Sequence, residues 1–252
     1  MNNAPLRDAA PLCEPLAATS APSSVAAVPL RRVAGVLAVR PVLLLAMGLA
    51  LVAAGASLIW MNGLIILVDL IALAVVHRAL RAEGRSLADL FRPWRWADLA
   101  WGLLMFVIVM IGFVAVSFAA NLIVYQGAPP ASGLPLPQIP LWFGLLALIV
   151  MPLTVALSEE AVYRGYAQPR LGRRWGTAVS LLVVAFVFGL QHIGFSLTDP
   201  SAVLARVIAT FLAGIMFGLL WLWLRRITPL VIGHWLLDVV GLGLPTLMLA
   251  LS

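Results

Sequence analysis

Two adjacent glutamates and an arginine stand in an otherwise apolar part of the chain. They occur in "LSEEAVYRGY", residues 157–166, directly after the apolar run "LWFGLLALIVMPLTVA". A charge near the centre of a bilayer costs about 2.5–3.5 kcal/mol on insertion scales, so these side chains require partners or a function. Glu160 and Arg164 have the i, i+4 spacing of a helical ion pair. Glu159 is rotated about 100° from Glu160 on a helix. It has no obvious local partner and is the better candidate for chemistry.

Two histidines lie in short motifs further along the chain. "FVFGLQH" ends at His192, with Phe188 one turn earlier on the same face. "HWLLD" begins at His234 and places Asp238 on the same helix face. An aspartate beside a histidine can hold its tautomer and orientation in a metal site or in an acid–base site. His77, beside Arg78 at the end of an apolar segment, is interpreted as structural.

Counting residues places these groups at one depth. If a helical hairpin turns at "LGRRW", Glu159 faces the level of residue 189, less than one turn from His192. Counted from Arg226 at 1.5 Å per residue, His234 and Asp238 lie about 12 and 18 Å along the last apolar segment. We therefore expect one intramembrane cavity lined by Glu159, Glu160, Arg164, His192, His234 and Asp238.

The composition is that of an integral membrane protein. The 252 residues are 63% hydrophobic and 10% charged, against about 25% charged in an ordinary soluble domain. All 16 basic residues are arginine, and they gather at the ends of apolar segments. Membrane topology therefore explains the net charge of +6 better than nucleic-acid binding does. The single cysteine, Cys13, excludes an intramolecular disulfide and any zinc site built from several cysteines, which leaves His, Glu or Asp as metal ligands.

The elements that position these residues are expected to form an all-α, polytopic transmembrane bundle. Apolar segments of about bilayer length fall near 41–60, 63–80, 97–125, 141–170, 176–195, 203–224 and 228–250. These are seven spans, or eight if the last is broken at "GLGLP", residues 241–245. Residues 1–30, rich in Ala, Pro and Ser, are expected to be a disordered tail. Residues 31–252 then form one transmembrane domain, with the motif-bearing core at 141–250.

Every second connection is rich in arginine, which predicts a cytoplasmic amino terminus. Arg31, Arg32 and Arg40 are counted before the first span, and residues 126–140 carry no charge. In the basic connection, Ser86 and Asp89 stand in capping-box positions, so a short interfacial helix is expected there. Asp69 receives no role, and three explanations stay open for it: pairing with Arg206, pairing with Arg164, or protonation. Gly214 and Gly218 are expected to allow close helix packing.

Three motifs together resemble the CPBP or Abi family, the CAAX prenyl protease and bacteriocin-processing group. They are EExxxR at Glu159–Arg164, FxxxH at Phe188–His192, and HxxxN or HxxxD at His234–Asp238. Their order and spacing both fit, over about residues 141–250. The first 140 residues resemble the family only in being hydrophobic.

The resemblance implies an intramembrane endopeptidase acting on a membrane-associated protein or peptide. In it Glu159 and His192 activate water, and His234 with Asp238 polarises the scissile carbonyl and stabilises the oxyanion. Glu160, Arg164 and Phe188 would support the site. Where the family has Asn at this position, the neutral amide can donate a hydrogen bond to the oxyanion, but Asp238 can donate only when protonated. Orienting His234 and binding a metal are therefore the other roles open to Asp238. Because the family is often called a metalloprotease, Glu159, His192 and His234 are also a candidate zinc ligand set.

Two other classes of function remain open. A non-catalytic scaffold or immunity-type protein would keep the polar cluster as a structural network, and a small transporter would use it to bind its substrate. The expected partners are the lipid bilayer and the substrate, with no nucleic acid. The all-arginine usage is compatible with a bacterial inner membrane.

Overall fold

The computed structural model describes residues 28–130 and 137–252. The tail expected at 1–30 therefore lies almost wholly outside the described residues. Within them every regular element is a helix and no strand occurs. Helices are the expected solution in lipid, because each backbone N–H and C=O group must be satisfied within its own segment.

Among the residues that the structure describes, seven segments are long and apolar enough to cross a membrane. This confirms the expected number, and the last segment is not split into two spans. In chain order the elements are α1 (Leu30–Ala53), η1 (Leu58–Trp60), α2 (Met61–Arg81), η2 (Leu87–Leu90), α3 (Ala97–Tyr125), α4 (Leu141–Ile149), α5 (Met151–Glu159), η3 (Glu160–Ala167), α6 (Gln168–Trp175), α7 (Thr177–Leu190), η4 (Ile193–Phe195), α8 (Pro200–Leu224), α9 (Thr228–Asp238), η5 (Val239–Gly243) and α10 (Leu244–Leu251).

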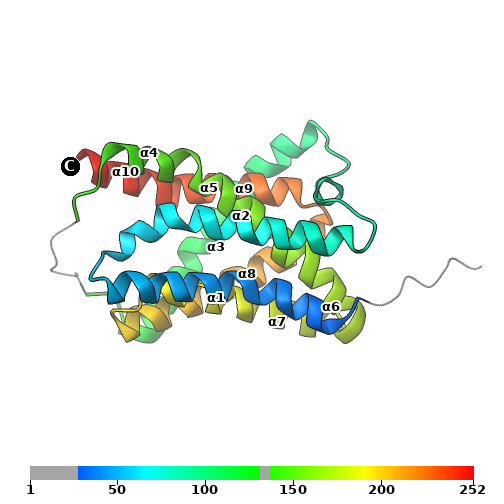
Figure 1. Ribbon diagram of the computed structural model, residues 1–252, viewed down its shortest axis with the longest axis horizontal. Helices are drawn as coiled ribbons and strands as arrows, with labels where there is room; N and C mark the ends of the chain where they lie inside the picture. Colours follow the sequence, from blue (N-terminus) through cyan, green and yellow to red (C-terminus); the bar gives the residue numbers. More distant parts are fainter. Residues whose placement is uncertain (1–27, 131–136) are drawn as a thin grey trace, which may run out of the picture.

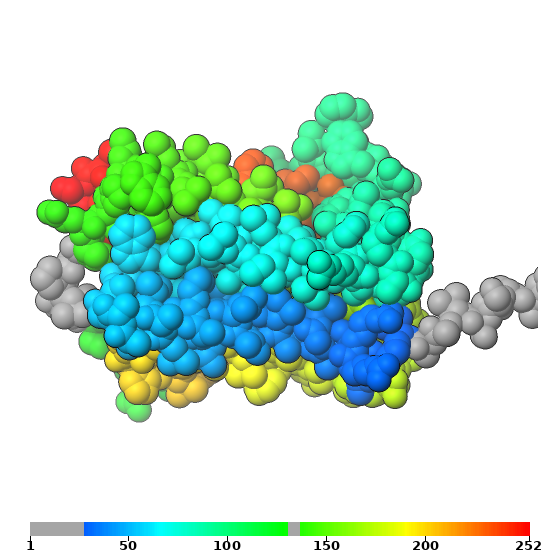
Figure 2. All heavy atoms as spheres, in the orientation of Figure 1, coloured from blue at the N-terminus to red at the C-terminus, as the bar shows by residue number. Residues whose placement is uncertain are grey.

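The helices run side by side along the long axis of the molecule (Figure 1). We call the end that carries the start of α1 and the connections 82–96, 175–176 and 225–227 the arginine-rich end. The opposite end, the arginine-poor end, carries the connections 54–57, 126–140 and 193–199 and the carboxyl terminus. Figure 2 shows the face to which α1 and α2 contribute. These two helices expose apolar side chains, among them Val42, Leu49, Leu67 and Leu70, as lipid-facing helices do.

The first expected span was misplaced. It runs from Leu30 to Ala53 and not over 41–60, whereas the second expected span, 63–80, lies within the segment Leu58–Arg81. The expected span began at Pro41, and the residue before a proline ordinarily disfavours the helical conformation. In the fold Pro41 lies inside α1. Arg40 is therefore a buried residue of a spanning helix, and counting it as an arginine of the first connection was wrong.

The interfacial helix is a single short turn, η2, in the connection 82–96. Its capping box is confirmed, because Ser86 N donates to Asp89 Oδ2 at 2.7 Å and the Ser86 side chain is bonded in return. That backbone bond holds the pKa of the Asp89 carboxyl below its ordinary value. The connection is fastened to the bundle by Arg226, whose Nη2 donates to Asp98 Oδ2 at 2.6 Å.

The span that carries the first motif changes from α-helix to π-helix at Glu160. Pro169 begins the next α-helical turn and has no N–H to donate to the preceding turn. The side chain of Arg170 compensates, since its Nη1 donates to Tyr166 O at 2.8 Å. π-Helical turns are frequent at functional sites, and this one directly follows Glu159. A second π-helical segment, η5, precedes Pro245 in "GLGLP".

Close packing of α7 on α8 depends on glycine, as the sequence predicted. A Cβ atom on Gly214 would lie 3.0 Å from Ala185 Cα, and one on Gly218 would lie 2.3 Å from Leu181 Cδ1. The carbonyl groups of the two glycines accept hydrogen bonds from Arg164 Nη2 at 3.1 Å and from Gln168 Nε2 at 3.2 Å. The same glycines therefore join α7, α8 and the span of the first motif.

Candidate active site

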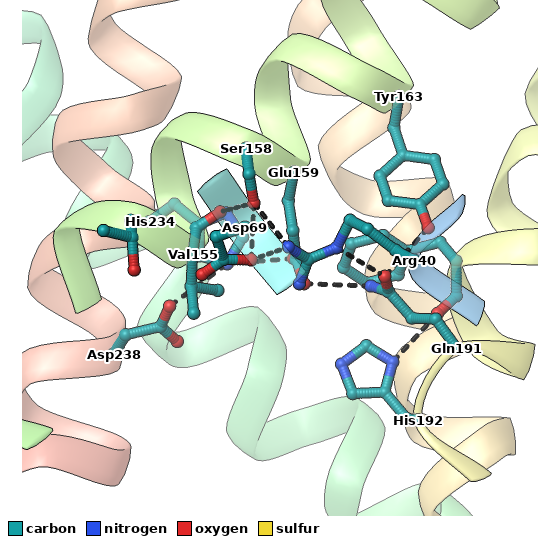
Figure 3. Close-up of polar contacts among 12 residues, drawn as sticks. Arg40, Asp69, Val155, Ser158, Glu159, Tyr163, Gln191, His192, His234 and Asp238 are labelled. Carbon is teal, nitrogen blue, oxygen red and sulfur yellow. Dashed lines mark hydrogen bonds and ion pairs between the residues drawn. The ribbon is translucent and has the colours of Figure 1, made fainter. Parts of the chain in front are cut away.

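Glu159 has a partner that sequence reasoning did not find. Arg40 of α1 donates from Nη2 to Glu159 Oε1 at 2.8 Å, and both side chains are buried (Figure 3). The same carboxylate oxygen accepts from Gln191 Nε2 at 2.9 Å. The other oxygen, Oε2, has His234 Nε2 at 3.6 Å. One side of the carboxylate is thus held by two donors, while the other side lies toward the histidine.

Arg40 is the centre of a buried polar network. It forms an ion pair with Asp69, and it donates to Ser158 and, from Nε at 2.9 Å, to Gln191 Oε1. Ser158 donates to Asp69 Oδ1 at 2.8 Å. These contacts explain Asp69, whose partner is Arg40, so the candidates Arg206 and Arg164 were wrong. Opposite charges from α1, α2 and α5 compensate one another inside the membrane, as buried charges must.

His234 joins the two glutamates of the first motif. Its Nδ1 lies 2.9 Å from Glu160 Oε1. A carboxylate oxygen can only accept, so Nδ1 carries the proton. Glu160 also forms the expected ion pair with Arg164, at 3.4 Å. The Arg164 guanidinium lies over the rings of Phe188 and Phe217, 4.7 and 5.1 Å from their centroids.

The orientation of His192 is fixed by its own helix. Its Nδ1 lies 2.8 Å from the carbonyl oxygen of Phe188, which also has only acceptor capacity. The ring therefore carries a proton on Nδ1, and in the neutral ring Nε2 keeps its lone pair. The Phe188 and His192 rings are 5.2 Å apart, which confirms that the two lie on one face. His192 is poised to accept a proton at Nε2.

Asp238 makes a looser contact than its spacing suggested. Its Oδ2 is 3.6 Å from His234 Nε2, which is too long for a hydrogen bond. Among the side chains of residues 28–130 and 137–252, none offers that oxygen a hydrogen bond. Glu160 instead holds the other ring nitrogen, so the expected orienting role of Asp238 belongs to Glu160. Asp238 remains close enough to act on His234 through its charge.

Four of the six expected residues line one cavity of about 330 Å³. They are Glu159, His192, His234 and Asp238. Glu160 and Arg164 do not line it. They lie behind His234, which they support, so the expectation that all six line the cavity was wrong for this pair. Phe188 and Phe217 form part of its wall.

A metal fits this arrangement poorly. In the part of the chain that the structure describes, no group of three His, Cys, Asp or Glu side chains is placed to hold a metal ion. One oxygen of Glu159 already accepts from Arg40 and Gln191. A guanidinium in direct contact with a carboxylate repels a dication from it. Glu159, His192 and His234 therefore do not form the candidate zinc site in this conformation.

The segment that carries these groups also matches a known family. Residues 140–240 match the family model described as Type II CAAX prenyl endopeptidase Rce1-like. The resemblance to the CPBP family is confirmed. CAAX proteases are hydrolases, so the match points to an intramembrane protease. A search among curated proteins and a search among solved structures returned no match.

Half of the polar network around Glu159 lies outside the Rce1-like segment. Arg40 and Asp69 belong to α1 and α2, whereas Ser158 and Gln191 stand beside the motif residues. The sequence did contain a signal for this pair, because Arg40 and Asp69 are opposite charges in two neighbouring apolar helices. Two such charges in a membrane compensate each other best by pairing. Ser158 and Gln191 gave no signal, because a neutral polar residue beside a motif is common.

Proposed function

We propose that the protein is an intramembrane endopeptidase that hydrolyses a peptide bond of a membrane-associated protein or peptide. The carrying observation is that Glu159, with one oxygen held by Arg40 and Gln191, shares a cavity with a His192 ring whose Nε2 is free to accept a proton. A water molecule between Glu159 Oε2 and His192 Nε2 would lose its proton as its oxygen attacks the scissile carbonyl carbon. The proton then passes to the leaving amine nitrogen as the C–N bond breaks.

His234 is the group best arranged to stabilise the oxyanion. Glu160 accepts from Nδ1, and Nε2 lies between carboxylate oxygens of Glu159 and Asp238, each at 3.6 Å. Those charges favour a proton on Nε2, which can then donate to the developing negative oxygen of the substrate. Because the hydrogen bond to Glu160 orients the ring before substrate binds, little reorganisation is needed during the reaction. No step of this proposal passes through a metal.

The proposal is tested by comparing the new amino termini of membrane proteins in cells that hold equal amounts of wild-type and His192→Ala protein. Termini that appear only with the wild type would support an endopeptidase and would identify substrates. If both proteins give the same termini and also the same cellular phenotype, the protein is a non-catalytic scaffold. Uptake of a solute that depends on the wild type, without new termini, would favour the transporter.

A further inference from the structure

The active-site cavity extends toward the arginine-poor end of the bundle. Leu58 and Ile59 of η1 and Phe195, the last residue of η4, line it, and all three belong to connections at that end. Arg206 and Thr210 contribute from the first half of α8, which starts there. The exposed residues Gly241 and Leu242 also line the cavity.

The arginine-rich end is closed by side-chain contacts. Arg226 pairs with Asp98, Thr228 Oγ1 donates to Phe91 O at 3.2 Å, and Arg170 pairs with Glu83. Leu90 and Phe91, in the connection 82–96, pack on Ile227 and Val231. A separate pocket of about 240 Å³ lies there, and it shares no lining residue with the active-site cavity.

The lining combines an apolar wall with one cation. Leucine, isoleucine, valine, methionine and phenylalanine side chains form most of it. Among the described residues, Arg206 is the one arginine in the lining. Its Nε donates to Ser196 Oγ at 2.7 Å, and its guanidinium lies 5.9 Å from the Phe195 ring centroid. No carboxylate in residues 28–130 or 137–252 forms an ion pair with Arg206.

We propose that this cavity takes an extended, apolar segment of a substrate protein from the arginine-poor end, with a substrate carboxylate against Arg206. The inference rests on the proposed function and names its substrate class. Apolar side chains of the segment would exchange lipid contacts for the cavity wall. A carboxylate would compensate the charge of Arg206, an exposed side chain whose hydrogen bond to Ser196 leaves that charge unpaired within the described residues. An acyl chain is disfavoured as the occupant, because it offers no polar group to the Glu159, His192 and His234 side chains that line the cavity and no charge to Arg206.

The entry route can be tested by thiol labelling that needs no catalysis. In a Cys13→Ser background, Val155→Cys places a thiol on the cavity wall with little change in volume, and Leu237→Cys is a second position. Ser57→Cys and Arg173→Cys are exposed references for the arginine-poor and arginine-rich ends. In reconstituted membranes, a membrane-impermeant thiosulfonate reagent should reach the cavity thiol from the side that labels Ser57→Cys. Labelling only from the side of Arg173→Cys would overturn the route.

The occupant is tested by protection of the same thiol. The probes are three end-blocked ten-residue peptides of leucine and alanine, one neutral, one with a central Glu and one with a central Lys, together with oleate as an acyl chain. The Glu peptide should protect at about tenfold lower concentration than the neutral peptide. This advantage should vanish in Arg206→Gln and pass to the Lys peptide in Arg206→Glu. Equal protection by all three peptides, or better protection by oleate, would overturn the proposal.

Failure of this inference can be told from failure of the proposed function. Protection by the Glu peptide should persist in Glu159→Gln, because binding does not require the reaction. Protection of the thiol without any Glu159-dependent cleavage would support the binding site and reject the endopeptidase activity. Glu159-dependent cleavage with no protection and no effect of Arg206→Gln would keep the protease and reject this substrate class.

Discussion

At the scale of single residues, the site consists of two linked charge networks. Arg40 compensates Asp69 and Glu159, and Arg164 compensates Glu160, which holds His234. Breaking a buried pair by removing one partner costs about 3–5 kcal/mol, because the remaining charge is left desolvated. Substitutions should therefore separate residues that serve the reaction from residues that serve the fold.

Glu159 and Glu160 should behave differently when each is replaced by glutamine. Glu159→Gln keeps an oxygen that can accept from Arg40 and Gln191, and Arg40 retains Asp69, so the protein should accumulate normally. Cleavage should fall by about 10²–10⁴-fold, as for other general bases. Glu160→Gln leaves Arg164 unpaired and should lower accumulation. Protein level and cleavage are measured in the same membranes. A well-expressed Glu159→Gln protein with full activity would contradict the mechanism.

Removing Arg40 should destabilise the fold although it lies outside the Rce1-like segment. Arg40→Gln leaves the Asp69 and Glu159 carboxylates without their cation, at a cost of about 3–5 kcal/mol. Adding Asp69→Asn removes one of the two stranded charges and should recover part of the accumulation. Arg31→Gln, at an exposed position of the same helix, is the matched control. An Arg40→Gln protein as stable as this control would show that the network contributes little.

Chelators should leave proteolysis unchanged. Arg40 and Gln191 occupy one oxygen of Glu159, and a positive charge there weakens cation binding. Purified protein is assayed after treatment with EDTA and with 1,10-phenanthroline, and again after zinc is added. Loss of activity on chelation and recovery with zinc would mean that Glu159, His192 and His234 rearrange into a metal site.

At the scale of elements, close backbone contacts fix where the motif residues lie. Gly48 of α1 meets Gly194 of η4, two residues after His192, and a Cβ on Gly48 would lie 2.3 Å from Gly194 O. A Cβ on Gly194 would lie 2.4 Å from Leu44 O. Helix α1 therefore supplies Arg40 to Glu159 and, two turns further along, the surface that holds the segment after His192.

Gly194→Ala and Gly48→Ala should both reduce activity and stability. The added methyl group meets backbone atoms that cannot move aside, and overpacking typically costs about 1–3 kcal/mol. A displaced η4 also shifts His192 relative to Glu159. Gly35→Ala on the same helix has nothing within 4 Å and should be neutral or slightly stabilising. Thermal unfolding in detergent and cleavage rates provide the comparison. Equal unfolding temperatures and cleavage rates for all three variants would show that the backbone can adjust at the contact between Gly48 and Gly194.

At the scale of the whole molecule, the alternation of charge assigns a direction to the bundle. The arginine-rich end carries the arginines of the connections 82–96 and 225–227 and those of the last turn of α6, Arg173 and Arg174. The described residues of 126–140 carry no charge. From the positive-inside rule we predict that the arginine-rich end and the amino terminus lie in the cytoplasm. The active-site cavity would extend toward the opposite leaflet.

This orientation should be visible by labelling in intact cells. In a Cys13→Ser background, an impermeant maleimide should react with Gly127→Cys but not with Arg173→Cys. After the cells are opened, both should react. Both positions are exposed in the fold, so access and not burial decides the result. The reverse pattern would invert the molecule and place the cavity on the cytoplasmic side.

The sequence by itself determined the class of fold and most of the candidate site. Apolar length fixes the number of spans, because a bilayer has a set thickness and requires internal hydrogen bonding. Three motifs on the fourth, fifth and seventh spans then bring Glu159, His192, His234 and Asp238 to one depth, since helical rise converts residue count into distance.

The tertiary structure alone decided which charges compensate one another. Arg40 beside Pro41 has the local features of a span boundary, and Asp69 has no partner within reach in its own helix. Their pairing, and the contact of Arg40 with Glu159, depends on how α1, α2 and α5 pack. It was likewise packing that gave the orienting contact of His234 to Glu160 instead of Asp238. Helix periodicity fixes depth and face within one segment, but the angular positions of segments around the bundle arise only from side-chain packing between them.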